Sequence, residues 1–175
     1  MKRFFYFSII ALCFLGCKHV EPQKETPIFK IAMLKNSVIA PLINNDTIVI
    51  EEFSIYDGDV QFSFEGKIFS DEQFNLEVTT TRNTFAVENK TTDELCIHIC
   101  EKTQYDTYDE NGEFIETVYP VTKNFSAKIS DEQEFYTHCS PKVAGNHIIT
   151  YDFHEKEKPN VKISVTVIYK YHSEN

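Results

Sequence analysis

The stretch NVKISVTVIYKY, residues 160–171, alternates apolar and polar side chains at every second position. Its apolar set consists of Val161, Ile163, Val165, Val167 and Tyr169. The segment VQFSFEG, residues 60–66, repeats the pattern with Val60, Phe62 and Phe64. Successive side chains of a β-strand point to opposite faces, so a period of two predicts strands with one buried face. The β-branched and aromatic residues in both stretches favour the same structure.

Turn signals divide the chain into short segments. Asp57-Gly58 and Asn111-Gly112 are dipeptides that accept positive φ in two-residue hairpin turns. Polar clusters predict further reversals, and they lie at residues 70–73, 89–94, 130–133 and 154–160. Only IFKIAMLKNS, residues 28–37, has a spacing that would also suit a short helix. The number of segments between these turns predicts an all-β domain of about ten short strands, arranged as two antiparallel sheets packed face to face.

The tetrapeptide SDEQ occurs twice, at residues 70–73 and 130–133. Ser and Asp side chains bond nearby backbone groups and so favour turns between apolar strands. We interpret the repeat as one turn chemistry used twice. Duplication of half a sandwich is the alternative that the sequence leaves open.

Residues 84–171 resemble bacterial immunoglobulin-like sandwiches of the cell envelope. The features that carry the resemblance are Asn89 at the end of a first strand, the polar turn at 130–133, and Gly145 opening the penultimate strand. The resemblance implies an immunoglobulin-like antiparallel β-sandwich. It implies no activity, because this architecture hosts many functions.

The N-terminus has the pattern of an export signal. Lys2 and Arg3 precede an apolar run over residues 4–15, which is too short for a permanent membrane span, so residues 1–16 read as a signal peptide. The sequence FLGC at 14–17 resembles the lipobox of Gram-negative bacterial lipoproteins. The resemblance implies that the chain is cut before Cys17 and that its thiol is acylated. An ordinary secretory signal is the alternative.

The segment KHVEPQKETP, residues 18–27, is polar, contains two prolines and shows no periodicity. It is typical of a flexible tether, so residues 17–27 are expected to join the lipidated cysteine to one sandwich domain over residues 28–175. Lys18 stands where many inner-membrane lipoproteins carry Asp. The resemblance therefore implies an outer-membrane location, on the periplasmic or the surface face.

The charge balance limits the partners. Removal of residues 1–16 takes away two bases and no acid, which changes the net charge from −10 to −12. Such a chain repels phosphate backbones, so nucleic acid is excluded as a partner. It also disfavours a body lying on anionic lipid. The expected partners are the membrane, through the N-terminal lipid, and an envelope protein or ligand of unknown identity.

The segment CIHIC, residues 96–100, is the nearest approach to a chemical site. As a continuous strand it places Cys96, His98 and Cys100 on one face and Leu95, Ile97 and Ile99 in the core. The two thiols of this strand would then lie about 13 Å apart, whereas a disulfide needs Cα atoms within about 7 Å. The pattern therefore predicts that these two cysteines do not bond each other.

Cys139 is the remaining thiol of the expected domain. Export favours a disulfide from Cys139 to either Cys96 or Cys100, and three free thiols are the alternative. A copper or zinc site would need His98 with one of these two cysteines and a further ligand. The further ligands considered are Cys139, His138 and His147. No CxxC or HxxxH spacing supports such a site, so no metal and no cofactor are predicted.

No catalytic constellation is present in the sequence. It contains no nucleophile elbow, phosphate loop or zinc helix. His138 and Cys139 are adjacent in a strand, so they point to opposite faces and cannot form a catalytic pair. We predict a non-catalytic binding or scaffolding module that binds through strand edges or the loops at 102–112 and 140–146. An inhibitor or immunity protein, and a copper or zinc chaperone using Cys96, His98 and Cys139, are the alternatives.

Overall fold

The computed structural model describes residues 25–35 and 38–172, which are almost entirely β-strand. The first strands are β1 (Phe29–Lys35), β2 (Val38–Leu42), β3 (Asp46–Ile50), β4 (Ser54–Tyr56), β5 (Asp59–Arg82) and β6 (Thr92–Ile97). The others are β7 (Ile99–Lys102), β8 (Tyr105–Tyr108), β9 (Phe114–Val118), β10 (Thr122–Ser140), β11 (Gly145–Glu155) and β12 (Lys162–Tyr171). One short helix, α1 (Thr84–Glu88), follows β5. The predicted all-β class is confirmed.

Several sequence-based expectations concern the chain ends and the helices. The predicted signal peptide, Cys17 and residues 18–24 of the tether lie outside the described residues. Residues 29–35, whose spacing would also suit a short helix, form the strand β1. Across 25–35 and 38–172, no helix has the length and apolar character needed to cross a membrane.

Two long strands take part in both layers of the sandwich. The first half of β5 pairs with β1, its second half pairs with β11, and β10 follows β5 on the other side along nearly its whole length. One layer therefore contains β3, β12, β11 and half of each long strand, and we call it the β11 layer. The other contains β2, β1, β6, β7 and the remaining halves, and we call it the β6 layer. All of these pairings are antiparallel except the parallel pairing of β3 with β12.

The two SDEQ segments lie where the sheet bends from one layer into the other. Ile129 pairs with Phe74 and Asp131 pairs with Ser70, so residues 71–73 of β5 face the single residue 130 of β10. Asp131 takes a positive φ of 64° there. The chain does not reverse at either segment, so the two predicted turns are wrong. Their turn chemistry instead forms a bulge that bends two paired strands together.

The core lies between the layers. In β5 and β10 the buried side chains fall at every second position on both sides of the bend, and aromatic pairs join the two layers. Ring centroids lie 5.2 Å apart for Phe29 and Phe74 and 5.3 Å apart for Phe135 and Phe153. The Tyr169 hydroxyl meets the Thr137 hydroxyl at 2.8 Å, so this buried phenol has a polar partner. The two-layer sandwich predicted from the alternation is thus the observed arrangement.

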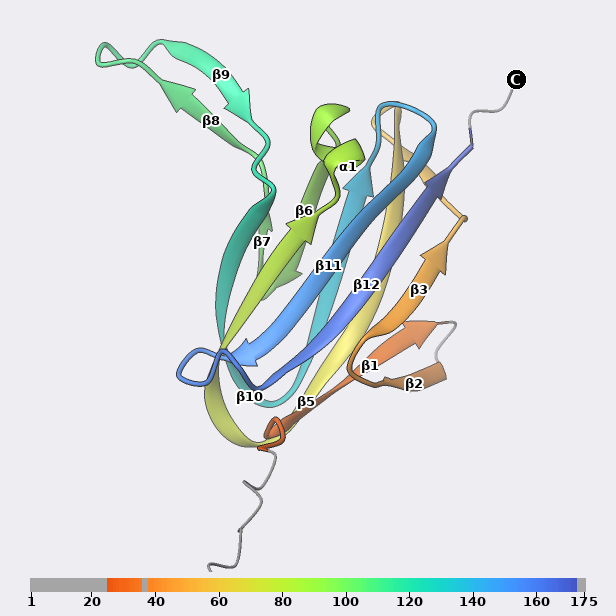
Figure 1. Ribbon diagram of the computed structural model, residues 1–175, viewed down its shortest axis with the longest axis vertical. Coiled ribbons are helices and arrows are strands. Elements are labelled where there is room, and N and C mark those ends of the chain that lie inside the picture. The colour runs from red at the N-terminus through yellow and green to blue at the C-terminus, as the bar shows by residue number, and fades with distance from the viewer. Residues whose placement is uncertain (1–24, 36–37, 173–175) are drawn as a thin grey trace, which may run out of the picture.

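Both predicted hairpins are present, although residues 109–113, rather than a two-residue turn, connect the second pair of strands. Asp57 and Gly58, with φ of 51° and 83°, connect β4 to β5. Asn111 and Gly112 lie at the tip of the β8–β9 hairpin, which forms its own two-stranded sheet and projects from one end of the sandwich (Figure 1). β1 begins at the opposite end (Figure 1). The described residues form twelve strands rather than about ten. They are also less uniformly short than predicted, because β5 and β10, with 24 and 19 residues, each continue across the bend.

A buried ion pair joins the layers at the end far from the bend. Nη1 of Arg82, the last residue of β5, lies 3.0 Å from Oδ1 of Asp93 in β6, and both side chains are almost fully buried. The same guanidinium donates to the carbonyl oxygens of Thr91 and Pro120, and the Thr103 hydroxyl donates to Asp93. Burial raises the pKa of the Asp93 carboxyl, and Arg82 opposes that rise. Each buried charge therefore depends on its partner.

Substitution of Arg82→Met should destabilise the fold by about 3–5 kcal/mol, because it leaves the Asp93 charge buried and uncompensated. Urea unfolding measures this loss. The matched control is Lys142→Met, which breaks the exposed Lys142–Asp59 pair and should cost at most about 1 kcal/mol. Equal losses in the two variants would contradict a structural role for the buried pair.

Candidate functional site

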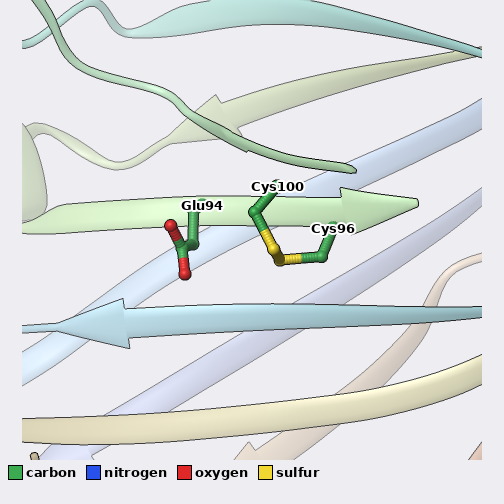
Figure 2. Close-up of side chains that lie close together, drawn as sticks. All are labelled: Glu94, Cys96 and Cys100. Carbon is green, nitrogen blue, oxygen red and sulfur yellow. A yellow bond between two sulfur atoms is a disulfide. The ribbon is translucent and has the colours of Figure 1, made fainter. Parts of the chain in front are cut away.

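The CIHIC segment forms a tight hairpin closed by a disulfide. β6 ends at Ile97 and β7 begins at Ile99, so Cys96 and Cys100 are paired residues on neighbouring strands. Their Cα atoms lie 3.8 Å apart and their sulfur atoms are bonded (Figure 2). The prediction that these two cysteines cannot pair is wrong, and so is the predicted disulfide from Cys139. The extended-strand distance of about 13 Å does not apply because the strand does not continue.

His98 is the residue that reverses the chain. Its φ of 63° lies in the left-handed region, which His enters more readily than most residues with a side chain. Its Nε2–H donates to the Lys128 carbonyl oxygen at 3.0 Å, which fixes the ring against β10. Leu95 and Ile97 are buried as predicted, whereas Ile99 is 68% exposed because it lies beyond the turn. No glycine or Asn-Gly signal marks this turn in the sequence.

Cys139 lies on the other side of the sheet. It is a free thiol, fully buried in the core, and it pairs with Phe62 of β5 and Asp93 of β6. Burial raises the pKa of this thiol well above its usual value. Cys139 therefore cannot reach the hairpin or serve as a nucleophile.

The ligand set of the alternative metal chaperone, Cys96, His98 and Cys139, is not brought together. His98 faces Lys128, and the sheet separates Cys139 from Cys96. His147 is buried, with Nε2–H donating to the Val143 carbonyl at 2.9 Å and Nδ1 accepting from the Thr91 hydroxyl at 2.6 Å. Burial lowers its pKa. Neither histidine is free to bind a metal beside the hairpin.

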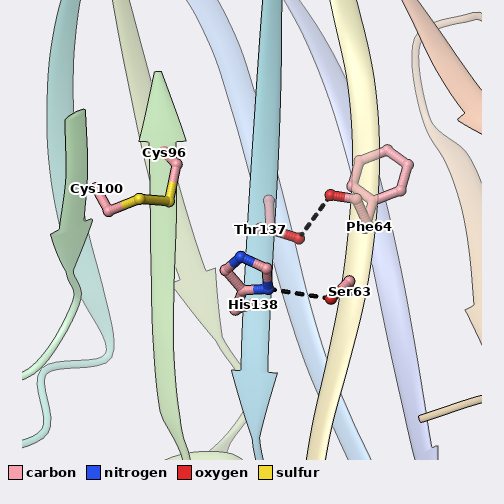
Figure 3. The surroundings of a disulfide bond; sticks show 6 residues. All are labelled: Ser63, Phe64, Cys96, Cys100, Thr137 and His138. Carbon is pink, nitrogen blue, oxygen red and sulfur yellow. Dashed lines mark hydrogen bonds between the residues drawn. A yellow bond between two sulfur atoms is a disulfide. The ribbon is translucent and has the colours of Figure 1, made fainter. Parts of the chain in front are cut away.

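The outer face of the β6 layer carries polar groups beside the disulfide. Glu94 precedes Cys96 by two residues and shares its face, and His138 of β10 is the cross-strand partner of Glu94. His138 Nδ1 lies 3.0 Å from Ser63 Oγ of β5 (Figure 3). Sequence reasoning singled out His138 only as a distant candidate and missed Glu94 and Ser63. The signal for Glu94 was its spacing of two from Cys96.

A polar hollow of about 360 Å³ opens beside these residues. It lies between the β4–β5 turn and the strands β10, β6 and β7. Its charged lining consists of Asp59, Asp93, Glu94, Lys102, His138 and Lys142. Glu94 and His138 are therefore accessible from solvent on the side away from the core.

Charged pairs continue along the same face. Lys67 contacts Glu132 and lies 3.3 Å from Glu134. The Tyr136 hydroxyl donates to Glu134 at 2.7 Å, and this hydrogen bond, together with Lys67, lowers the pKa of Glu134. Tyr136 is also the cross-strand partner of Cys96. The hairpin thus borders a surface on which Glu134 is held in its charged form.

A second, larger depression runs along an edge of the sandwich, and we call it the edge groove. It measures about 870 Å³ and lies between the end of β1, β3, the loop to β4, and residues 61–65 of β5. Phe53 contacts Phe62 and Tyr171 there, with ring centroids 5.6 and 6.0 Å apart. Val49 and Phe53 remain 48% and 40% exposed. The groove therefore has an apolar floor open to solvent.

Comparisons with known proteins give a fold and no family. No family model matches the chain, and no curated protein matches it. The N-terminal domain of PorA is similar in structure, with a TM-score of 0.56 and 15% identity over 83% of this chain and 99% of that chain. This likeness shows a shared fold alone.

Two other solved structures are more distant. A PapD-like domain of human CEP192 has a TM-score of 0.38 and 9% identity over 96% of this chain and 100% of that domain. CfaE, the adhesive subunit of CFA/I fimbria of enterotoxigenic Escherichia coli, has a TM-score of 0.35 and 12% identity, covering 74% of this chain and 46% of CfaE. The packed antiparallel layers define the protein as an immunoglobulin-like β-sandwich, in agreement with the sequence-based prediction.

The three thiols should differ in their reaction with iodoacetamide, followed by peptide mass spectrometry. In the unreduced native protein none of Cys96, Cys100 and Cys139 should be alkylated, and urea should expose Cys139 alone. After reduction without denaturant, Cys96 and Cys100 should react while Cys139 stays protected by burial. A peptide linking Cys139 to either hairpin cysteine would contradict the observed pairing.

Proposed function

We propose that this protein is a non-catalytic binding module of the cell envelope, lipid-anchored at Cys17, whose edge groove receives an extended basic segment of a partner protein. The observation that carries the proposal is the pair of unpaired strand edges that form the groove walls. An extended segment adds to such an edge through main-chain hydrogen bonds.

The first wall is the edge of β5. Residues 62–65 pair with β10 on one side. On the other side, the pairing with β1 stops at Gly66 and the pairing with β4 stops at Gln61. On this side, no described strand therefore pairs with residues 62–65 of β5.

The second wall is the edge of β3, which pairs with β12 and with no other described strand. Its outward Val49 and the loop residue Phe53 supply apolar contacts for alternate side chains of a bound segment. A strand laid in the groove could therefore combine main-chain hydrogen bonds with alternate apolar contacts.

The charges of the groove favour a basic occupant. Glu51, Glu52 and Glu65 line it together with Lys35 and Lys170. Because Lys170 lies 2.9 Å from Glu51 and is paired with it, the two remaining acids outnumber the one remaining base. A second copy inserting its β8–β9 hairpin is disfavoured, since residues 105–118 contain five acids and no base. Opposite charge across an interface steers association and selects the partner.

A labelled nine-residue peptide in which Val alternates with Lys should bind the protein in fluorescence anisotropy. The same peptide with Glu in place of Lys, or with alternate backbone nitrogens methylated, should bind about tenfold more weakly or not at all. The double variant Glu52→Lys with Glu65→Lys should lose about tenfold in affinity for the Lys peptide, since two surface charge pairs contribute about 0.2–1 kcal/mol each before the new repulsion is added.

The matched control is Glu110→Lys with Glu113→Lys, which changes the net charge equally at the hairpin tip and should leave most of the affinity. Equal binding of the methylated peptide would exclude strand addition. An equal loss in the control variant would show that net charge, rather than the groove, attracts the peptide.

The lipid anchor rests on the FLGC sequence and on the position of β1. Twelve residue steps separate Cys17 from Phe29, which spans at most about 40 Å when extended. Because β1 begins at the end of the sandwich opposite the β8–β9 hairpin (Figure 1), the anchor would point this hairpin away from the membrane. A position away from the membrane suits this acidic hairpin, because anionic lipid repels it.

Substitution of Cys17→Ala should move the protein from the membrane fraction to the soluble fraction and should remove the mass of the acyl chains. Cys13→Ala is the matched control, because it changes a cysteine of the same signal without touching the acylation position. Retention of Cys17→Ala in the membrane fraction at unchanged mass would refute the anchor.

A further inference from the structure

The hairpin cysteines and Glu94 bring three metal-binding atoms into one small volume. The two sulfur atoms and a carboxylate oxygen all lie within 4.8 Å of one another (Figure 2). Donors bound to one tetrahedral zinc ion lie about 3.5–3.8 Å apart, as follows from Zn–S of about 2.3 Å and Zn–O of about 2.0–2.2 Å. Small side-chain rotations would therefore close these donors on one ion once the sulfur–sulfur bond is open.

His138 is placed to supply a fourth ligand. It lies directly across from Glu94, and the Cβ atoms of such a cross-strand pair are about 5 Å apart. Ser63 Oγ lies 3.0 Å from Nδ1, on the far side of the ring from the hairpin (Figure 3). In the tautomer whose Nδ1–H donates to Ser63, Nε2 keeps its lone pair. A metal-binding histidine is usually held in this way, by a partner of its other nitrogen.

The donor types select the metal. Two thiolates favour soft or borderline cations, and the carboxylate and imidazole then favour zinc over copper(I), which binds two thiolates without needing an oxygen ligand. The polar hollow of about 360 Å³, which Glu94 and His138 line, gives the ion an entry path.

We propose that the reduced CIHIC hairpin is a zinc site formed by Cys96, Cys100, Glu94 and His138, and that the disulfide is its metal-free state. A protein or small-molecule dithiol reduces the disulfide by thiol–disulfide exchange. The sulfur–sulfur bond breaks, both sulfurs gain a proton, and the dithiol leaves as its own disulfide. Zinc then displaces the two thiol protons as it binds.

This site is separate from the edge groove and uses none of the groove residues that recognise the partner. Its ligands come from β6, β7 and β10, and none of them lines the groove, although the orienting Ser63 does. Loss of peptide binding and loss of zinc binding are therefore independent results.

The test titrates zinc into the protein against a chromophoric chelator, with and without prior reduction by a phosphine, and counts bound metal by native mass spectrometry. The reduced protein should bind one zinc ion per chain and the oxidised protein none. Glu94→Gln and His138→Gln should each lower the zinc affinity about tenfold or more. Cobalt(II) in place of zinc should give the visible bands of a tetrahedral thiolate site.

Cys139→Ala is the matched control, because it removes a thiol that the fold keeps in the core, and it should leave zinc binding unchanged. The proposal fails if the reduced protein binds no zinc or if binding survives Cys100→Ser. It also fails if neither Glu94→Gln nor His138→Gln changes the affinity, since any pair of thiols would then suffice. Glu94→Gln and His138→Gln both keep the hairpin disulfide, so the oxidised form of each variant shows whether it is folded.

Discussion

The structure depends on the pairing of β5 with β10 through the bend between the two layers. Because each strand belongs to both layers, the ladder between them fixes the position of one layer on the other. The bulge formed by residues 71–73 against Ser130 bends the pair without breaking it and keeps inward residues on one parity on both sides. Phe62 and Leu76, on the two halves of β5, are both buried for this reason. A sandwich built in this way needs no loop between its layers at the bend.

The opposite end of the sandwich is joined by the Arg82–Asp93 pair. The bend holds the layers together at one end only, and β5 and β6 approach each other again where Arg82 and Asp93 meet. A buried ion pair contributes little net stability compared with apolar packing, but its geometry is specific. The guanidinium also bonds Pro120, just before β10 begins, and Asp93 bonds Thr103, just after β7 ends. These bonds therefore fix the base of the projecting β8–β9 hairpin together with the layers.

The sequence predicts what depends on periodicity and not what depends on a single backbone angle. Alternation over 160–171 and 60–66 correctly assigned buried faces, since burial on one face repeats along a strand. The dipeptides Asp57-Gly58 and Asn111-Gly112 marked real hairpins because Gly takes positive φ at little cost. His98 takes the same conformation without such a marker, so the CIHIC reversal was missed. The SDEQ segments show the converse error. Their residues predict turns, but turn-forming residues also suit a bulge inside a continuous strand.

The different environments of Cys96, Cys100 and Cys139 follow from the alternation of side chains along a strand and from the chain reversal at His98. On β10, Cys139 shares the inward parity of Phe135, and burial suppresses its ionisation. On β6, Cys96 has the outward parity of Glu94, and the turn at His98 brings Cys100 opposite it. A continuous strand would have left two separated outward thiols with no common chemistry. The reversal places both sulfurs beside Glu94, whose cross-strand partner is His138, so the φ of a single residue gives this face the one cysteine pair among the described residues.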